Sequence, residues 1–543
     1  MSGNRLLRST AVFSSMTFIS RVSGLVRDQV YAAVFGAGPA MDAFVVAFRI
    51  PNFMRRLSAE GSFSMAFVPV LAEYKAKGDQ AAIKALVDRV AGTLTAFLLV
   101  LTAVAVLAAP WVMRVFAPGF SADSEQARLA TEMLRITFPY ALFISLASMA
   151  GGILNTYQRF AVPALSPVLM NLSMIAAAVG LVPLMEGWGY EPVYALAWGV
   201  FAAGILQLAF HLPSLSRLGL LPRPRWGGSD PGVRKIMKLM VPTLFGASVA
   251  QVNLLINTMM ASFLIGGSVT WLYYSDRLLE FPLGMFGVAI GTVILPHLSS
   301  RHAATDPQGY SKGLDWGFRL CLLIGIPSCI GLIMCAEPLI ATLFQYRRFG
   351  AEDTRMTSLS VMAQSIAVPA FLLVKVLAPA FYSRQDTRTP VKAAVVSVIA
   401  NLLFTLLLFA GLLAFTDAGR AALALTGGRW FAALEHLPGA HALLALAIAL
   451  AGWLNALQLW WYLRRESVYA IQPGWGRFLR QVGLASVAMI AVLAVLLTQW
   501  HDWTPWAWWQ RALRLAALVG VGGAVYAGLL LAQGIRPRDL RGH

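Results

Sequence analysis

Charged residues and cysteines are scarce in this 543-residue sequence. Only 13% of the residues are Asp, Glu, Lys or Arg, whereas soluble domains carry about 25%. The three cysteines, Cys321, Cys329 and Cys335, share one apolar stretch and show no CxxC spacing. This excludes a disulfide framework and favours buried thiols. With 58% hydrophobic residues in long runs, the sequence predicts an all-α polytopic membrane protein.

Motifs of ATP-driven pumps and metalloenzymes are also missing from the sequence. It contains no G-x-x-x-x-G-K-[ST] phosphate-binding loop and no H-E-x-x-H zinc motif, and its seven histidines are scattered. We therefore predict a transporter rather than an enzyme, with no cofactor and no assigned metal site. A coupling cation, the membrane potential or the substrate gradient would have to supply the energy.

Apolar windows long enough to cross a membrane predict 14 transmembrane helices. They lie at residues 10–35, 42–72, 90–116, 129–155, 163–185, 193–215, 237–266, 271–299, 315–345, 355–382, 390–415, 440–463, 477–499 and 508–533. We interpret the first window as a retained helix rather than a signal peptide. Arg21 interrupts it, and no convincing small-residue cleavage site follows.

The net charge of +18 is distributed unevenly between the predicted loops. The connections after helices 2, 6, 10 and 12 and the C-terminal tail are basic, whereas the opposite loops are poor in Lys and Arg. The positive-inside rule then places both termini in the cytoplasm, and no nucleic-acid partner is needed to explain the charge. The exception is the pair Arg347 and Arg348 in an outer loop, and tryptophans between Trp500 and Trp509 indicate an outer aromatic belt.

The sequence contains a weak internal repeat. Pro69 and Pro296 lie 227 residues apart, and so do Pro163 and Pro390. This offset maps helices 1–6 onto helices 7–12 in the same orientation, and predicts two six-helix lobes related by a parallel repeat around a central cavity. The predicted domains are an N-lobe at 1–230, a C-lobe at 231–466, and helices 13 and 14 at 467–543.

Three predicted spans carry charged residues. These are Arg21, Arg27 and Asp28 in the first; Asp42, Arg49, Arg55, Arg56 and Glu60 in the second; and Asp276, Arg277 and Glu280 in the eighth. Each central Arg costs about 2.5–3.5 kcal/mol to insert into lipid, so we expect these side chains to face a water-filled cavity. A surplus of guanidinium groups there favours a phosphate or diphosphate ligand. The alternative is mutual pairing, of Arg21 with Asp28, Arg56 with Glu60, and Arg277 with Glu280, which would only lock the lobes together.

Several long segments resemble the MurJ (MviN) family of bacterial lipid II flippases, within the multidrug/oligosaccharidyl-lipid/polysaccharide exporter superfamily. They are "SRVSGLVRD" at 20–28, "GAGPAMDAFVVAFRIPNFMRRLSAEGSFSMAFVPVLAEYK" at 36–75, and the segments 138–164, 273–299 and 374–392. The resemblance covers nearly the whole chain. The segment 416–440 is longer than the family's usual connection at that place.

The resemblance implies a flippase that moves lipid II from the cytoplasmic to the periplasmic leaflet of the bacterial inner membrane, for peptidoglycan biosynthesis. The family's essential cavity arginines fall on Arg21, Arg27, Arg55 and Arg277, which would hold the diphosphate. Its essential acidic residue near the outer end of helix 2 falls on Asp42. Glu60, Asp276 and Glu280 match charged positions near the cavity or gate, and Asp28, Arg49 and Arg56 are further candidates for cavity charges.

The resemblance also implies partners and a lipid-tail site. Helices 13 and 14 border a groove for the lipid tail in the family, so lipid II and membrane lipids are the expected partners. Some members bind sodium through carboxylates in helices 7, 11 and 12, for which this sequence shows no clear counterpart. We expect a monomer that associates functionally with the cell-wall synthesis machinery.

Three alternatives remain open from the residues. A flippase for another lipid-linked oligosaccharide would share a cationic cavity. A drug/cation antiporter of the same superfamily would need a cavity dominated by acidic or aromatic residues. A membrane enzyme acting on lipid phosphates would need acidic metal ligands at a membrane face.

Overall fold

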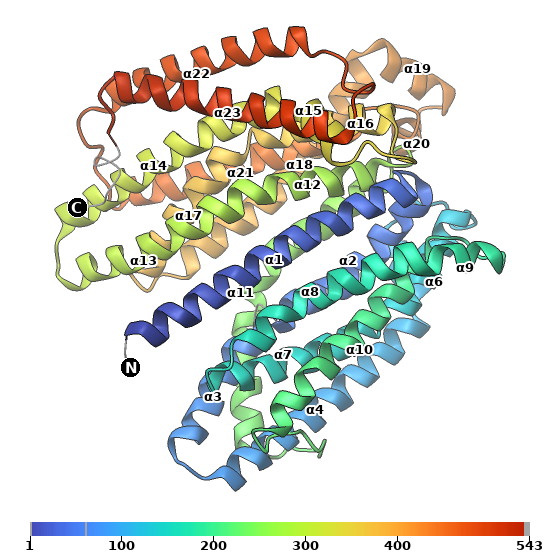
Figure 1. Cartoon of the computed structure of the whole chain (residues 1–543), viewed down its shortest axis with the longest axis vertical. Helices are drawn as coiled ribbons and strands as arrows, with labels where there is room; N and C mark the ends of the chain where they lie inside the picture. Colours follow the sequence, from blue (N-terminus) through green and yellow to red (C-terminus); the bar gives the residue numbers. More distant parts are fainter. Residues whose placement is uncertain (1–2, 60–61, 537–543) are drawn as a thin grey trace. The chain divides into compact units, whose positions relative to one another are not determined.

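The computed structural model describes residues 3–59 and 62–536, and all regular structure in these ranges is helical. The predicted all-α class is confirmed for this part of the chain. Helix contacts group the chain into two compact units, Met1–Gly267 and Ser268–His543, and most of their helices are labelled in Figure 1.

The first unit consists of eleven α-helices and one π-helical turn within its described residues. They are α1 (Gly3–Phe35), α2 (Pro39–Ala59), α3 (Ser62–Ala76), α4 (Gln80–Leu107), α5 (Ala109–Phe116), α6 (Glu125–Thr137), α7 (Tyr140–Thr156), α8 (Ala161–Ala176), the π-turn Ala177–Leu181, α9 (Val182–Gly187), α10 (Tyr194–Ser216) and α11 (Pro231–Ala261). Helix α1 packs against α8, and α11 packs against α3.

Polar caps begin several of these helices, and apolar side chains join them. Asp79 accepts hydrogen bonds from the N–H groups of Ala81 and Ala82 at the start of α4, and Asp230 caps α11 in the same way. The core at one end of the unit is made by α3, α4 and α7, which contribute Phe67, Leu86 and Ile153. Helix α2 packs mainly against α6 and α7, and α1 packs against α8.

The second unit is also helical throughout its described residues. Its elements are α12 (Ser268–Pro282), the π-turn Leu283–Gly287, α13 (Val288–Ala303), α14 (Pro307–Met334), α15 (Ala336–Leu343), α16 (Ala351–Ser365), α17 (Val368–Tyr382), α18 (Arg388–Phe415), α19 (Asp417–Leu425), α20 (Trp430–Leu434), α21 (Ala440–Arg465), α22 (Trp475–Gln499) and α23 (Trp508–Ala532). The two short helices α19 and α20 lie in the segment 416–440, which the family resemblance gives as longer than the usual connection.

Helices α22 and α23 lie side by side and pack on α14 and α15 within this unit (Figure 1). Their shared core includes Leu323, Met489, Leu493 and Leu518. The Tyr526 hydroxyl on α23 also donates to the carbonyl of Leu323 at 2.9 Å. The last two helices are therefore fastened to the second unit by both apolar and polar contacts.

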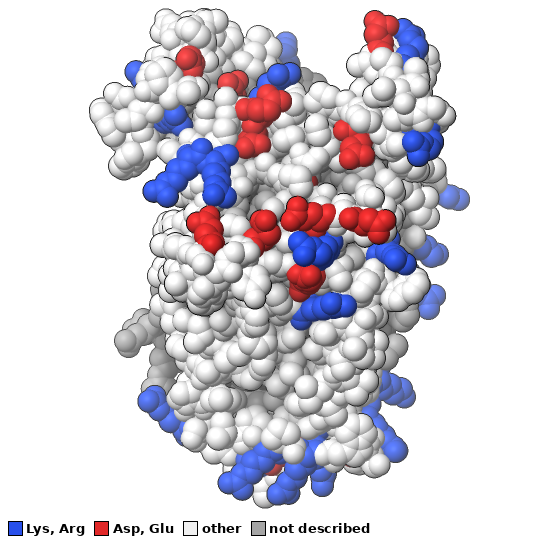
Figure 2. All heavy atoms as spheres, turned by 90° about the vertical axis from the view of Figure 1, so that its right-hand side faces the viewer, with Lys and Arg blue, Asp and Glu red and all other residues white. Residues whose placement is uncertain are grey.

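The helices are long and apolar enough for a multi-pass membrane protein. Among the described residues, ten helices have the length and composition of membrane spans, and an eleventh is the bent pair α16–α17. The other three predicted spans coincide with α1, with α2 and α3, and with α11. Most of the surface in Figure 2 is uncharged, with Lys, Arg, Asp and Glu gathered in limited patches, as expected for helices that contact lipid.

The helix bounds follow the repeat offset of 227. Helix α4 begins at Gln80 and α14 at Pro307, and they end at Leu107 and Met334. The bounds of α5 and α15 differ by the same 227 residues, from Ala109 to Ala336 and from Phe116 to Leu343. These matching bounds support the sequence repeat between the first and second halves.

The two units defined by helix contacts and the two lobes predicted from the sequence repeat differ in where they assign one helix, α11. The predicted lobe boundary at 230/231 assigns α11 to the C-lobe as the counterpart of α1, but α11 groups with the first unit because it packs on α3 and α2. The predicted domains 1–230, 231–466 and 467–543 describe the repeat and stay a prediction.

Candidate functional site

A buried ion pair lies on α1 of the first unit. Arg27 and Asp28 are only 6% and 3% exposed. The Nε and Nη2 atoms of Arg27 donate to Oδ1 of Asp28 at 3.0 and 2.7 Å. Nη1 donates to Oδ1 of Asn171 on α8 at 3.0 Å, and the guanidinium lies 5.5 Å from the ring centre of Tyr31. The carboxylate and the amide together fix the orientation of the guanidinium plane.

Asn171 connects this pair to the preceding turn of α1. Its Nδ2 donates to the Ser23 hydroxyl at 2.9 Å and to the Ser20 carbonyl at 3.1 Å. These bonds leave the amide oxygen of Asn171 facing Arg27. Sequence reasoning did not identify Asn171, because it lies 144 residues away from Arg27 in a window without charges.

The structure corrects one predicted pair. Asp28 pairs with Arg27, its neighbour in sequence, and Arg21 is exposed, so the predicted pairing of Arg21 with Asp28 is wrong. Helical spacing placed Arg21 and Asp28 on one face, but the long side chain of Arg27 bends back to the adjacent carboxylate. Asn171 contacts the same guanidinium through its third nitrogen, Nη1.

Helix α2 presents four of the predicted charges. Asp42, in its first turn, is 2% exposed and accepts the N–H of Gly267 at 2.6 Å. Arg49 donates to the hydroxyl of Thr258 on α11. Arg55 donates through Nε to Asn52 at 2.8 Å, and Arg56 is partly buried. Asp42 and Arg49 therefore tie α2 to α11 and to the chain that follows it.

Glu60 lies outside the described residues, so its predicted pairing with Arg56 stays a prediction.

In the second unit, the predicted charges gather on α12. Arg277 pairs with Glu280 at 3.1 Å, which confirms that predicted contact, and its Nη2 donates to the Tyr273 hydroxyl at 3.3 Å. Asp276 accepts from Nε2 of Gln364 on α16 at 2.7 Å, and Oε1 of Gln364 accepts from Ser275 at 2.8 Å. Gln364 was not identified from the sequence, because nothing local distinguishes it from other polar residues on α16.

The predicted diphosphate residues divide between the two units. Arg21, Arg27 and Arg55 lie on α1 and α2 of the first unit, and Arg277 lies on α12 of the second. Within each unit, Arg27 and Arg277 already hold a carboxylate partner. Their convergence around one ligand stays a prediction.

The described residues contain no group of three or more His, Cys, Asp and Glu side chains arranged to hold a metal ion.

A polar cavity of about 590 Å³ lies elsewhere in the first unit, between α5, α6 and the connection joining them. Its lining includes Arg114, Arg128, Arg135 and Glu132. The Tyr194 hydroxyl donates to the carboxylate of Glu132. None of the predicted site residues lines this cavity.

Comparison with known proteins identifies the family. The family model described as "Lipid II flippase MurJ" matches residues 31–511. The chain belongs to the MurJ family of lipid II flippases. A "Probable lipid II flippase MurJ" from Vibrio cholerae is 42% identical over 99% of this chain and 98% of its own length. A "Lipid II flippase MurJ" from Burkholderia cenocepacia is 40% identical over 98% of both chains.

Solved structures agree with the MurJ family at the level of fold. The structure titled "Lipid II flippase MurJ, inward closed conformation" has a TM-score of 0.72 and 24% identity, and covers 96% of this chain and 100% of its own. An inward-facing multidrug resistance MATE family transporter of the MOP superfamily has a TM-score of 0.61 at 13% identity, over 84% of this chain and 98% of its own. The fold of this chain is thus shared with a transporter of another family.

Proposed function

We propose that this protein is a flippase that moves lipid II from the cytoplasmic to the periplasmic leaflet by alternating access. The observation that carries the proposal is the match with the MurJ family along nearly the full chain. The substrate combines a diphosphate, a polar headgroup and a long apolar tail, which a membrane protein with intramembrane arginines is suited to bind.

In this proposal Arg21, Arg27, Arg55 and Arg277 bind the diphosphate. The Arg27–Asp28 pair supports the role, because an ion pair buried among apolar helices costs desolvation free energy and is retained where charge is needed. Without substrate, Asp28 neutralises Arg27. With substrate, the diphosphate supplies further negative charge, so a loaded cavity costs less to close than a cavity of unneutralised arginines.

The proposal includes the arrangement of the chain in the inner membrane. It has 14 membrane-spanning helices with both termini in the cytoplasm, in two lobes that follow the 227-residue repeat and close alternately around the substrate. Helices α22 and α23 border the path of the lipid tail. The protein acts as a monomer alongside the cell-wall synthesis machinery, and a cation gradient or the membrane potential supplies the energy.

Removing a single cavity arginine tests this function. We expect Arg27→Ala and Arg277→Ala to reduce the appearance of lipid II in the outer leaflet by at least tenfold, the effect of losing one charge-assisted contact of about 1.5–3 kcal/mol. Arg420→Gln is the matched control, because Arg420 is exposed and pairs only with its neighbour Asp417 among the described contacts. Normal transport by well-folded Arg27→Ala and Arg277→Ala proteins would reject the site.

Depleting the protein in cells distinguishes lipid II from other candidate substrates. If lipid II is the substrate, depletion should cause cell lysis together with accumulation of lipid II in the inner leaflet. Accumulation of a different lipid-linked oligosaccharide, with lipid II distributed normally, would instead assign the protein to that substrate.

A further inference from the structure

The polar cavity between α5 and α6 takes no part in the proposed transport site. Its lining includes charged side chains from both helices and from the connection between them, namely Arg114, Asp123, Glu125, Arg128, Glu132 and Arg135. The four that belong to α6 recur every three or four positions, so they form one stripe along a single face of that helix. Arg114 lines the same cavity from α5, and the cavity therefore brings charges of both signs together.

Arg114 and Arg135 lie at one surface of the membrane. Arg114 follows residues 90–113, Arg135 precedes residues 136–158, and neither range contains Asp, Glu, Lys or Arg. Each range is long enough to cross a membrane. The two spans are consecutive in the chain and are joined at residues 117–124, so their charged ends meet at the same surface. The two arginines are therefore at the level of lipid headgroups.

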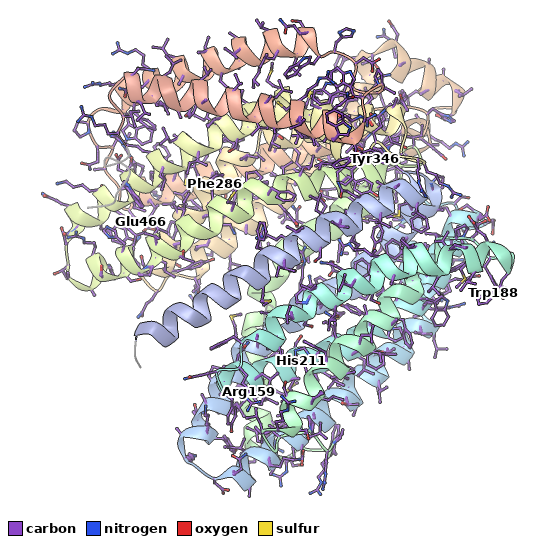
Figure 3. All side chains as sticks on the ribbon, in the orientation of Figure 1. Arg159, Trp188, His211, Phe286, Tyr346 and Glu466 are labelled. Carbon is purple, nitrogen blue, oxygen red and sulfur yellow. The ribbon has the colours of Figure 1, made fainter. Side chains whose placement is uncertain are left out.

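Exposed tryptophans occur at the same level. Trp111, on α5, is 68% exposed, and Trp188, at the end of α9, is 64% exposed. Trp188 lies at the end of the first unit opposite to Arg159 (Figure 3). The chain then leads to Tyr194, whose hydroxyl donates to the Glu132 carboxylate in the cavity. Tryptophans in such positions are typical of the interface between membrane and water.

Arg114 and Arg135 have no carboxylate partner in the part of the chain that the structure describes. The guanidinium of Arg114 lies 5.0 Å from the ring centre of Trp111, and an aromatic ring attracts a cation without neutralising its charge. Arg135 is exposed. Both guanidinium groups can therefore bind an anionic group at the headgroup level.

The other charges of the stripe have partners, with one oxygen to spare. Glu125 pairs with Arg128 at 3.6 Å, and both side chains are exposed. The Tyr194 hydroxyl donates to Oε2 of Glu132. Among the contacts of the described residues, Oε1 of Glu132 accepts no hydrogen bond. This oxygen can therefore accept one from a cationic group of a ligand.

The charges that line the cavity favour a ligand with no net charge. Three of these side chains are arginines, and three are Asp or Glu. A metal ion is not favoured, because the described residues contain no group of three or more His, Cys, Asp and Glu side chains arranged to hold one. A simple anion would be attracted by Arg135 but repelled by Glu132, one turn away. A ligand that carries both a phosphate and an ammonium group is attracted by both residues.

We propose that this cavity binds the headgroup of an aminophospholipid, in which two carbons join a phosphate to a primary ammonium. Arg114 and Arg135 donate to the phosphate oxygens, and the ammonium donates to Oε1 of Glu132. Glu132 and Arg135 are three residues apart on α6, so their Cβ atoms are about 5–6 Å apart. This spacing suits two charges that are separated by a two-carbon link.

The surface beside Arg114 suits the acyl chains of such a lipid. Leu107, Trp111 and Val115 follow one another at intervals of four residues and are 80%, 68% and 62% exposed. A lipid with its headgroup in the cavity can lay its chains along these apolar side chains. The proposed topology places the site in the outer leaflet, but the site does not depend on which lipid the protein transports.

The test measures amide hydrogen exchange of the full-length protein in detergent with added lipid. Phosphatidylethanolamine should slow exchange in residues 109–135. Phosphatidylcholine with the same acyl chains should need about a tenfold higher concentration for half of this protection, because its methylated ammonium donates no hydrogen bond. Phosphatidylglycerol, which has no ammonium group, should resemble phosphatidylcholine.

Two variants test the two halves of the headgroup. Arg135→Gln removes a phosphate contact and should raise the phosphatidylethanolamine concentration for half protection about tenfold. Glu132→Gln keeps an acceptor for the Tyr194 hydroxyl but loses the carboxylate, so phosphatidylethanolamine should lose its advantage over phosphatidylcholine. Arg159→Gln is the matched control, since it removes an exposed arginine at the opposite end of the same unit. It should leave the protection unchanged.

If Arg135→Gln does not fold, Arg114→Gln at an exposed position replaces it, with the same expected weakening. Equal protection by phosphatidylethanolamine and phosphatidylcholine in the unchanged protein would overturn the site, and so would full protection in the arginine variants. Equal protection by soluble phosphoethanolamine would show that the ligand is not a lipid. Loss of protection in Arg135→Gln together with normal lipid II transport would support a lipid site that is separate from transport and would leave the proposed function intact.

Discussion

Asp28 determines both the orientation and the charge balance of Arg27. Two guanidinium nitrogens contact one carboxylate oxygen, and a third contacts Asn171. A buried charge that loses its partner keeps its desolvation cost without the compensating attraction. Asp28 and Asn171 can therefore control the position of Arg27 through their contacts with its guanidinium, without contacting the substrate themselves.

Asp28→Ala should lower the free energy of unfolding by about 3–5 kcal/mol, because it leaves the Arg27 guanidinium buried without its carboxylate. Arg27→Ala/Asp28→Ala should cost less than the sum of the two single changes. The measurement is a double-mutant cycle in chemical or thermal unfolding. Asp417→Ala, which breaks an exposed pair, is the control and should leave the free energy of unfolding nearly unchanged. If the losses in the free energy of unfolding from Arg27→Ala and Asp28→Ala simply add in the double variant, the two side chains have no coupling energy.

Asp306 lies outside the membrane-spanning segments. Its carboxyl group makes the stability of the protein depend on pH. The N–H of Gly309 donates to its carboxylate at 2.8 Å and lowers the pKa of Asp306, and Arg301 lowers this pKa further. A lowered folded pKa adds stability above the unfolded carboxyl pKa, and this stability is lost as the pH falls through the folded value.

The variant Asp306→Asn should therefore lower the unfolding temperature at pH 7, with a difference from the unchanged protein that shrinks as the pH falls below about 4, the usual carboxyl range. Asparagine still caps the start of α14, so the comparison isolates the charge. A difference that stays constant from pH 7 to pH 3 would show that ionisation of Asp306 does not contribute.

At the scale of elements, the connection between α10 and α11 is seated on α4. The N–H of Arg225 donates to the carbonyl of Asp88 at 3.0 Å, and the N–H of Arg223 donates to the Asp88 carboxylate at 2.7 Å. A side chain at Gly92 would overlap the backbone of Arg225. Glycine is required at position 92 because the backbone of the connection passes directly against α4 and leaves no room for a side chain.

Gly92→Ala should force this connection away from α4 and cost about 1–3 kcal/mol, as overpacking of a buried contact does. Hydrogen exchange in residues 217–230 should become faster, and unfolding should occur at lower temperature. Gly411→Ala on α18 is the matched control. A Cβ there meets no atom within 4 Å, so the gain in helix propensity should leave stability equal or slightly higher. Unchanged exchange in Gly92→Ala would contradict the close contact.

Local patterns predicted the elements better than the contacts between them. Apolar windows of membrane-spanning length overlap α4, α10 and α18, and the spacing of Arg277 and Glu280 predicted their pair. The partner of Asp28 was missed, because a choice between Arg21 and Arg27 depends on Asn171 from a distant helix. The same holds for Gly92, whose requirement appears only when the connection at Arg225 lies against it.

At the scale of the whole molecule, the sequence repeat and the apolar spans lead to different conclusions about whether α11 crosses the membrane. Its bounds, Pro231–Ala261, correspond to those of α1, Gly3–Phe35, at an offset near 227. Helix α11 is not among the eleven apolar spans of the described residues. If α11 crosses the membrane as α1 is predicted to do, the two halves have the same orientation.

Labelling of two cysteines decides whether α11 crosses the membrane. Six of the apolar spans in the described residues lie between Arg223 and Asp502, namely Ser268–Ala303, Pro307–Met334, the bent pair Ala351–Ser365 and Val368–Tyr382, Arg388–Phe415, Ala440–Arg465 and Trp475–Gln499. Six crossings would place both residues on the same side, whereas α11 makes seven and places them on opposite sides. With Cys321, Cys329 and Cys335 replaced by Ala, we expect a membrane-impermeant maleimide to label Asp502→Cys in intact cells. It should label Arg223→Cys only after the membrane is permeabilised, and labelling of both in intact cells would remove α11 from the membrane and end the parallel repeat.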